Sequence, residues 1–243
     1  MIKKYITYFD DNQIEEYNLK EDDNTILFKG NDTLYSGESI NNLNTFYCEL
    51  CTMYYVWKNN LKSDYVVFEQ YRRPFDFESA GKLPEEGEAI CYEPLDIYGS
   101  PVIYHYSMYH GKRRAYDLLR IMIDLYGQNS DYVKYLQRGK ILYTNNTFAM
   151  RWDDFCDLCE FVFRTTESID KFYKLKHNYQ KYLTNSREYT EDDRFDYQTH
   201  WMAYIGERLV SCYIATKMKP ITIPRLENNG FYSPYQKKEE TQN

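Results

Sequence analysis

The chain has 243 residues, and its 30 Lys and Arg against 37 Asp and Glu give a net charge of −7, which argues against binding nucleic acids through their phosphates. Aromatic residues make up 18% of the chain while Gly and Pro number only 10 and 7, so neither a largely disordered nor a collagenous protein fits. The longest stretch without a formal charge is shorter than a membrane span and no secretory signal is readable, which together predict a cytoplasmic protein.

The first part of the chain alternates strand and helix patterns. Short strands are predicted at 5–9 and 25–29, and apolar residues at three- and four-residue intervals predict an amphipathic helix over 44–57. A β-branched and aromatic run at 64–70 predicts a buried strand, and a charged turn, 71–74, follows it. Helix, short loop and buried strand form half of an α/β unit.

The remainder of the chain is predicted to be richer in helix. Residues 76–110 lack a long periodic pattern and are predicted to be irregular, with a short strand at 89–92. Three further helices and three further strands are predicted from apolar spacing: helices at 112–126, 153–182 and 197–217, and strands at 140–143, 147–150 and 221–224. The two strands at 140–150 are expected to form a pair or one kinked strand. We expect one domain, 1–224, and a loose polar tail, 225–243.

Two cysteine pairs have the spacing of zinc ligands. Cys48 and Cys51 form one pair, and Cys156 and Cys159 form the other. Each pair lies within an apolar helical pattern, where a spacing of three places both thiols on one helix face, and neither has a Gly-rich knuckle. This context favours buried structural cysteines over a zinc site.

Common catalytic fingerprints of hydrolases, zinc proteases and nucleotide-binding loops are absent from the sequence. The remaining candidates begin with Arg72 and Arg73, at the end of the strongest predicted strand, where open α/β sheets bind ligands. Two guanidinium groups there could bind a diphosphate. The alternative is that they open a loop and pair with Asp76 or Glu78.

Three further positions have both a functional and a structural interpretation. Asn145 and Asn146 suit hydrogen bonds to sugar hydroxyls, and they equally suit a tight turn. His110 is predicted to precede a helix, as a base, a phosphate contact or a surface residue. Glu207 lies on an apolar helix, where it could abstract a proton or form a structural ion pair with Arg208.

Several motifs in chain order resemble a bacterial polysaccharide-biosynthesis family that was long catalogued only as a domain of unknown function. The motifs begin with Asn41–Asn44, the YCEL segment Phe46–Leu50, Tyr55–Asn59, Asp64–Val66 and Gln70–Phe75. Pro94, His110 and the segments 145–150 and 201–209 continue the resemblance, which covers roughly residues 35–224. The family includes capsular glycosyltransferases, some of them linked to galactofuranose transfer.

The resemblance implies a glycosyltransferase-A-like α/β fold, with a central sheet flanked by helices and a helix-rich C-terminal half. It implies transfer of a hexose from a nucleoside-diphosphate sugar to a glycan or lipid-linked acceptor in surface polysaccharide synthesis. It also implies that the protein is cytoplasmic and associates peripherally with the inner face of the membrane. By this resemblance and our inferences from it, the roles are catalysis for Glu207 and His110, diphosphate binding for Tyr71, Arg72 and Arg73, and sugar or acceptor binding for Glu49, Gln70, Asn145 and Asn146.

Metal dependence is left open by the sequence. Many enzymes of this fold hold a divalent metal with an Asp-x-Asp motif after the fourth strand, whereas this chain has Glu69 to Arg73 there, so Mn²⁺ or Mg²⁺ is not required by the pattern. Gln70 also stands where the family usually has His. A carbohydrate-binding or scaffold protein that keeps the fold is therefore the alternative function, and an acidic interaction protein is the third.

Overall fold

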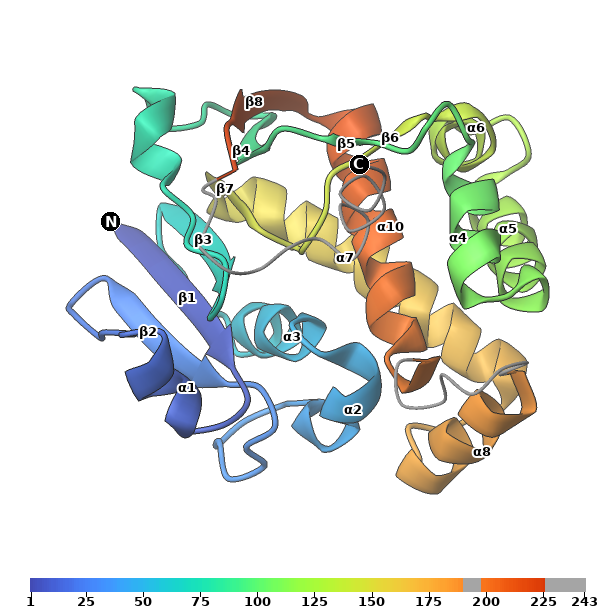
Figure 1. Ribbon diagram of the computed structural model, residues 1–243, viewed down its shortest axis with the longest axis horizontal. Helices are drawn as coiled ribbons and strands as arrows, with labels where there is room; N and C mark the ends of the chain where they lie inside the picture. The colour runs from blue at the N-terminus through green and yellow to red at the C-terminus, as the bar shows by residue number, and fades with distance from the viewer. Residues whose placement is uncertain (190–197, 226–243) are drawn as a thin grey trace, which may run out of the picture.

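A computed structural model describes residues 1–189 and 198–225. Its six-stranded mixed sheet lies on the left in Figure 1, with most of the helices to its right. In spatial order its strands are β2 (Thr25–Lys29), β1 (Ile2–Tyr8), β3 (Tyr65–Gln70), β7 (Phe148–Arg151), β4 (Glu88–Tyr92) and β8 (Lys219–Ile223). Strand β7 is antiparallel to both neighbours, and the other pairs are parallel. Five strands therefore end at one edge of the sheet, and β7 begins there.

The helices pack mainly on one face of this sheet. They are α1 (Asn12–Glu16), α2 (Asn44–Tyr47), α3 (Leu50–Lys58), α4 (Val102–His110), α5 (Lys112–Tyr126), α6 (Asp131–Arg138), α7 (Trp152–Tyr173), α8 (Tyr179–Tyr189) and α10 (Trp201–Lys217). On β3, Val66 and Phe68 point into the large core beneath the helices, and Val67 points into a smaller core on the other face. The short 3₁₀ helix η2 (Phe77–Ala80) covers part of that second face.

The α/β class and most predicted strands are observed, but three predicted elements are wrong. The helix predicted over 44–57 is broken at Cys48, whose φ of 46° ends α2 before α3 begins. The stretch predicted as irregular contains α4, at whose end His110 lies. The helix predicted over 153–182 is two helices, because Lys174 adopts a left-handed conformation with φ of 57°.

The two strands predicted at 140–150 do not pair with each other. Strand β6 (Ile141–Leu142) pairs with β5 (Leu95–Asp96) in a separate small sheet, whereas β7 enters the central sheet between β3 and β4. Asn145 and Asn146, with φ of 74° and 52°, turn the chain between the two sheets. The predicted helix start near Tyr197 and the tail from 226 onward lie outside the described residues. Within the described residues, no helix is both long and apolar enough to cross a membrane.

The four cysteines with zinc-ligand spacing lie on or beside helices. Cys51 and Cys159 are fully buried, while Cys48 and Cys156 are half-buried, and all of them are free thiols. Burial raises the pKa of the Cys51 and Cys159 thiols well above the ordinary value, so these thiols are uncharged and contribute to packing.

Candidate functional site

Polar side chains meet where β3 ends and β7 begins. Gln70, the last residue of β3, donates a hydrogen bond from Nε2 to the backbone carbonyl of Asn145 at 2.8 Å. The two segments lie side by side because β3 and β7 pair in register from Phe68 and Phe148. The sheet itself therefore places the predicted Asn145–Asn146 segment beside the predicted end of the strand.

A chain of hydrogen bonds connects this edge to helix α10. The guanidinium of Arg73 donates from Nη1 to the side-chain oxygen of Asn145. The backbone N–H of Asn145 donates to Oε1 of Glu207 at 2.7 Å, and Oε2 of Glu207 accepts from Nη1 of Arg208 at 2.7 Å. Arg73 thus contacts Asn145 rather than the acidic residues of the following loop, and Glu207 has the predicted ion pair with Arg208.

Glu49 adds a second carboxylate to this cluster. The pKa of Glu49 is raised to about 6, chiefly by burial and also by the neighbouring Glu207, whereas Arg72 and Arg73 act to lower it. Burial and the neighbouring Arg72 lower the pKa of Arg73 from its ordinary value, while Glu207 and Glu49 oppose that shift. Two arginines and two carboxylates therefore interact electrostatically at one place, which we call the edge cluster (Glu49, Arg72, Arg73, Asn145 and Glu207).

The backbone around both carboxylates is unusually constrained. Glu49 follows Cys48, whose left-handed φ is rare for a residue other than Gly. Leu50, the next residue, packs against Gly206, where an added methyl group would overlap the Leu50 side chain. Since Gly206 immediately precedes Glu207, this close approach of α3 and α10 fixes the separation of Glu49 and Glu207.

Asn146 turns its side chain into the protein at the same turn. The residue is buried, and its Oδ1 atom has no hydrogen-bond partner among the described residues. A buried amide oxygen without a partner is costly in an apo protein. Asn146 is therefore a group that a ligand hydroxyl could satisfy.

Two predicted site residues, His110 and Tyr71, lie outside both the edge cluster and the turn formed by Asn145 and Asn146. His110 is buried and stacks on Tyr204, with ring centroids 4.1 Å apart, and its Nδ1 lies 3.4 Å from Gln198 Oε1. Tyr71 directly follows β3, and its backbone N–H donates to the Thr7 carbonyl of β1 at 3.0 Å. Its ring makes edge-to-face contacts with Phe9 and Tyr17 at centroid distances of 6.1 and 5.0 Å. His110 is thus part of the packing between α4 and α10, and Tyr71 belongs to an aromatic group beside the cluster.

Three cluster neighbours were not predicted from the sequence. The sequence indicates Arg208 only as a partner of Glu207 and places Arg225 in the polar tail. In the structure Nη2 of Arg225 donates to Thr144 Oγ1 at 2.7 Å, and its charge lowers the pKa of Arg73. His105 on α4 has its pKa lowered to about 4 by burial and by Arg208. No spacing marks Arg225, and His105 belongs to a helix that the sequence pattern missed.

The residues at the end of β3 do not bring two carboxylates together as metal ligands. Glu69 points to the opposite face from Gln70, and its Oε2 lies 3.0 Å from the Lys4 ammonium. The described residues contain no group of three or more His, Cys, Asp or Glu side chains placed to hold a metal ion. Arginine charge occupies the end of β3 instead.

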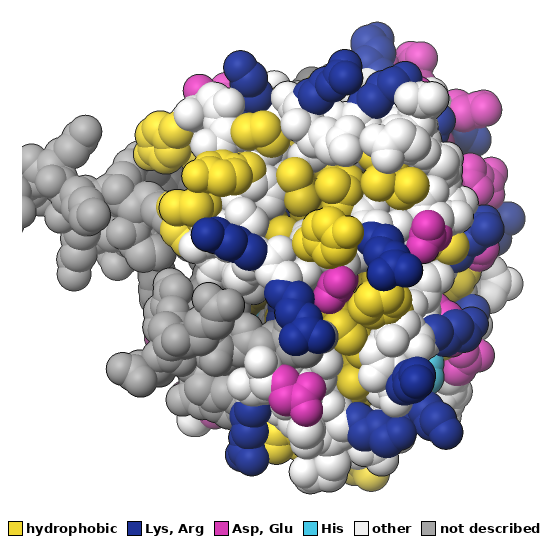
Figure 2. Space-filling view, turned by 90° about the vertical axis from the view of Figure 1, so that its right-hand side faces the viewer, with side chains coloured by type: hydrophobic (Ala, Val, Ile, Leu, Met, Phe, Trp, Pro, Cys, Tyr) yellow, Lys and Arg dark blue, Asp and Glu magenta, His cyan; other side chains and the backbone are white. Residues whose placement is uncertain are grey.

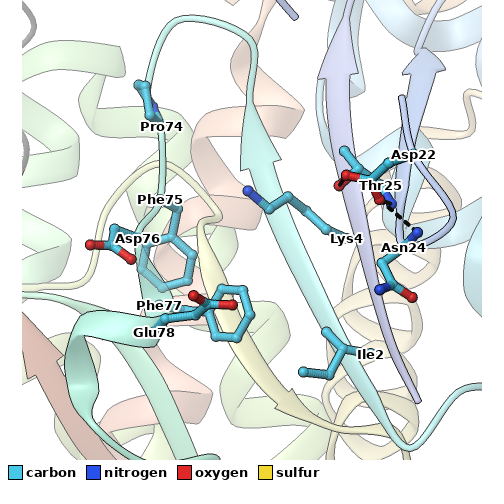
Figure 3. A pocket seen from close by; sticks show the side chains of 10 residues that line it. All are labelled: Ile2, Lys4, Asp22, Asn24, Thr25, Pro74, Phe75, Asp76, Phe77 and Glu78. Atoms are coloured by element: carbon cyan, nitrogen blue, oxygen red, sulfur yellow. Dashed lines mark hydrogen bonds between the residues drawn. The ribbon is translucent and has the colours of Figure 1, made fainter. Parts of the chain in front are cut away.

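A separate groove of about 460 Å³ opens on the other face of the sheet. Figure 3 shows Lys4 and Ile2 of β1 between the turn at Asp22–Thr25 and the Phe75 and Phe77 rings. The Asp22 carboxylate is already bonded to backbone N–H groups of that turn. The groove lies across the sheet from the helices and shares no residue with the edge cluster.

The mixed central sheet and its helices match the glycosyltransferase-A-like α/β fold class expected from the sequence, and a charged cluster lies where the parallel strands end. The chain belongs to the family described as a domain of unknown function (DUF4422), which matches residues 14–218. Its fold is similar to the apo structure of WbbM, a bifunctional glycosyltransferase, with a TM-score of 0.64 and 21% sequence identity over 96% of this chain and 47% of that chain. The chain thus spans about half of that protein's length, and at this identity the likeness concerns the fold. No curated protein matches the chain.

Proposed function

We propose that the chain is a glycosyltransferase that binds a nucleoside-diphosphate sugar at the edge cluster. The supporting observation is the Arg73 guanidinium, which Asn145 holds at the edge where five strands end. Ligands of open α/β sheets bind at this edge, and guanidinium groups bind diphosphates through paired hydrogen bonds. Arg72 and Arg73 would then stabilise the charge that develops on the leaving diphosphate.

The groups around Arg73 suggest an arrangement for the rest of the donor. Tyr71, with Phe9 and Tyr17, offers aromatic surface beside the arginines for the nucleoside. The partnerless oxygen of Asn146 offers a hydrogen-bond acceptor to a sugar hydroxyl, and Gln70 holds the backbone of this turn in place. We infer a hexose donor, galactofuranose or galactopyranose, from the family resemblance.

Glu49 is the carboxylate best suited to activate the acceptor. Both oxygens of Glu207 are already hydrogen-bonded, to the Asn145 N–H and to Arg208, whereas the pKa of Glu49 lies close to neutral pH. In this mechanism Glu49 takes the proton of an acceptor hydroxyl, whose oxygen bonds to the anomeric carbon. The bond from that carbon to the diphosphate breaks, and its electron pair leaves with the diphosphate. Glu207, for which the resemblance implied catalysis, is then a positioning residue that holds the Asn145 backbone. His110, for which it also implied catalysis, packs against Tyr204 and has no part in this mechanism.

Calorimetry with UDP-, GDP- and dTDP-sugars tests this proposal, with and without Mn²⁺ or Mg²⁺. We expect one donor to bind the full chain and Arg73→Ala to weaken that binding, while the exposed Arg164→Ala serves as the matched control. The acceptor, a glycan or lipid-linked sugar, is then identified by release of nucleoside diphosphate. If no nucleotide sugar binds under any of these conditions, the proposal is wrong.

One observation favours the alternative of a carbohydrate-binding or scaffold protein. Arg73, Gln70 and Asn145 already bond to each other, so the edge is partly satisfied without a ligand. Such a protein would bind a glycan through the aromatic group of Tyr71, Phe9 and Tyr17 and through the Asn146 amide. Glycan binding without release of nucleoside diphosphate, from any donor that binds, would favour this alternative.

A further inference from the structure

Helix α4 exposes large apolar side chains and buries polar atoms. Tyr104 and Met108, four residues apart on one face, are 54% and 59% exposed. Figure 2 views this side of the molecule and shows hydrophobic side chains gathered on its surface. The opposite face carries the fully buried Tyr106, and the half-buried His105 lies beside it. A helix that only packs on a core shows the reverse distribution, with its apolar stripe inward and its polar side chains in solvent.

Three polar atoms between α4 and α10 have no hydrogen-bond partner among the described residues. They are Nδ1 of His105, the hydroxyl of Tyr106 and Nε of Arg208. Tyr106 is fully buried and Arg208 is only 4% exposed. Because a buried polar atom without a partner destabilises a protein, such atoms are rare, and three of them in one place indicate a site for a polar ligand.

The three atoms lie together beside Glu207. The guanidinium of Arg208 lies over the Tyr106 ring, 5.4 Å from its centroid, and Nη1 of Arg208 donates to Oε2 of Glu207. His105 adjoins Tyr106 and interacts electrostatically with both Arg208 and Glu207. The Glu207 side chain is 18% exposed and His105 is half-buried, so solvent reaches this place from their side. We call His105, Tyr106 and Arg208 the α4–α10 subsite.

The α4–α10 subsite and the arginines of the edge cluster lie on different sides of the Glu207 carboxylate. Its Oε1 accepts from the backbone of Asn145, whose side chain binds Arg73, and its Oε2 accepts from Arg208. The electrostatic partners of His105 are Arg208 and Glu207. A donor whose diphosphate binds Arg73 therefore leaves the side of Arg208 to a second substrate.

Sugar hydroxyls fit these three atoms better than a charged group does. Glu207 already balances the charge of Arg208, and burial, followed by Arg208, lowers the pKa of His105 to about 4, so the subsite has no net charge at neutral pH. The Arg208 Nε–H donates, while the Tyr106 hydroxyl and a neutral imidazole nitrogen can each donate or accept. A sugar hydroxyl also donates and accepts, so neighbouring hydroxyls of one ring can satisfy all three atoms.

We propose that the α4–α10 subsite binds the terminal sugar of an uncharged glycan acceptor through its hydroxyl groups. This inference rests on the proposed function and assigns its acceptor side to residues without a predicted binding role. The sugar enters beside Glu207, where the half-buried His105 ring turns toward solvent to admit it, and Tyr106 and Arg208 bind its hydroxyls beneath. Any lipid or diphosphate carrier of the acceptor lies outside the subsite.

Titration of the full chain with methyl glycosides of galactose, glucose and mannose, followed by ligand-observed NMR, tests this inference without turnover. We expect at least one glycoside to bind with a millimolar dissociation constant. Tyr106→Phe should bind it about 3- to 10-fold more weakly, through loss of one hydrogen bond, and should melt no lower than the wild type, because it removes an unpartnered hydroxyl. The monodeoxy glycoside that lacks the contacted hydroxyl should bind both proteins equally.

The matched control is Tyr126→Phe, which removes a hydroxyl that lies 3.0 Å from Thr165 Oγ1. It should melt lower than the wild type and bind the glycoside unchanged. The inference is overturned if no glycoside binds, if Tyr106→Phe and the control weaken binding equally, or if Tyr106→Phe melts lower and binds the glycoside as the wild type does.

Calorimetry with nucleotide sugars on the same proteins tests the proposed function separately. Tyr106→Phe should bind the donor as tightly as the wild type does, because the donor diphosphate lies on the Arg73 side of Glu207. A chain that binds a nucleotide sugar but no glycoside refutes this inference alone. A chain that binds a glycoside but no nucleotide sugar refutes the proposed function and, with it, the acceptor role of the subsite.

Discussion

Replacing Glu49 with Gln should stabilise the protein in a pH-dependent way. The pKa of Glu49 rises from 4.5 to about 6 on folding, and each pKa unit corresponds to about 1.4 kcal/mol. A carboxyl whose pKa is raised in the folded state favours folding below pH 4.5, and that contribution is lost as the pH rises through 6. Above pH 7 the charge on Glu49 therefore lowers the free energy of unfolding by at most about 2 kcal/mol. Because Glu49 is only half-buried and solvent screens its charge, we expect about 1–2 kcal/mol. Gln keeps the shape of the side chain without the charge.

Urea unfolding of the wild type and Glu49→Gln between pH 4 and pH 8 measures this effect. We expect equal stability near pH 4 and a variant about 1–2 kcal/mol more stable near pH 8. The exposed Glu160→Gln is the control and should show no such divergence. Turnover should fall about 10²- to 10⁴-fold in the same variant if Glu49 is the base. A variant that is less stable at pH 8, or equally shifted at every pH, would refute the electrostatic argument.

Substitutions at three further positions separate catalysis from stability. Arg73→Ala should lower turnover by about 10²- to 10³-fold while its melting temperature stays close to that of the wild type. Arg73→Lys should recover little turnover, because an ammonium group lacks the planar fork of a guanidinium. If Arg73→Ala consumes the donor as fast as the wild type does, Arg73 has a structural role. Trp57→Ala should lower the free energy of unfolding by about 2–3 kcal/mol and leave turnover per folded molecule unchanged, because the half-buried Trp57 ring stacks on Phe163 with ring centroids 5.6 Å apart. A smaller loss in urea unfolding would show that this contact contributes little to stability. Gly206→Ala should lower the free energy of unfolding by about 1–3 kcal/mol, because the added methyl group overlaps the Leu50 side chain. Urea unfolding and turnover are measured on the same variant, and an increase in stability would show that α3 and α10 can move apart to accept the methyl group.

The elements that local spacing specifies were predictable, and those that tertiary contacts specify were not. The buried run Tyr65–Gln70 is observed as predicted, within one residue. The break at Cys48 was missed because Phe46 and Leu50 are both fully buried, so the apolar pattern continues across it. Helix α4 was missed because Tyr104 and Met108 are exposed, which weakens the helical periodicity of its apolar residues.

The candidate site was predictable as residue types but not as an arrangement. Arg73, Asn145 and Glu207 were each proposed from the sequence, and the structure brings them together through hydrogen bonds between distant segments. Their contact depends on the pairing of β3 with β7, which no local pattern reveals. Arg225 follows the last strand without any periodic signal, so only its hydrogen bond to Thr144 places it near Arg73.

The strand order has a consequence for how the protein folds. Strand β4 pairs with β8, which brings Glu88 and Lys219 within 3.2 Å across a separation of 131 positions, and Gln70 contacts Asn145 across 75. Such distant pairings require large loops to close before contacts form, and chains dominated by them fold slowly. The edge cluster draws on β3, β7, α3 and α10, so it can assemble only when almost the whole chain is in place. Binding of a nucleotide sugar during refolding would therefore report the latest step of folding rather than the first collapse.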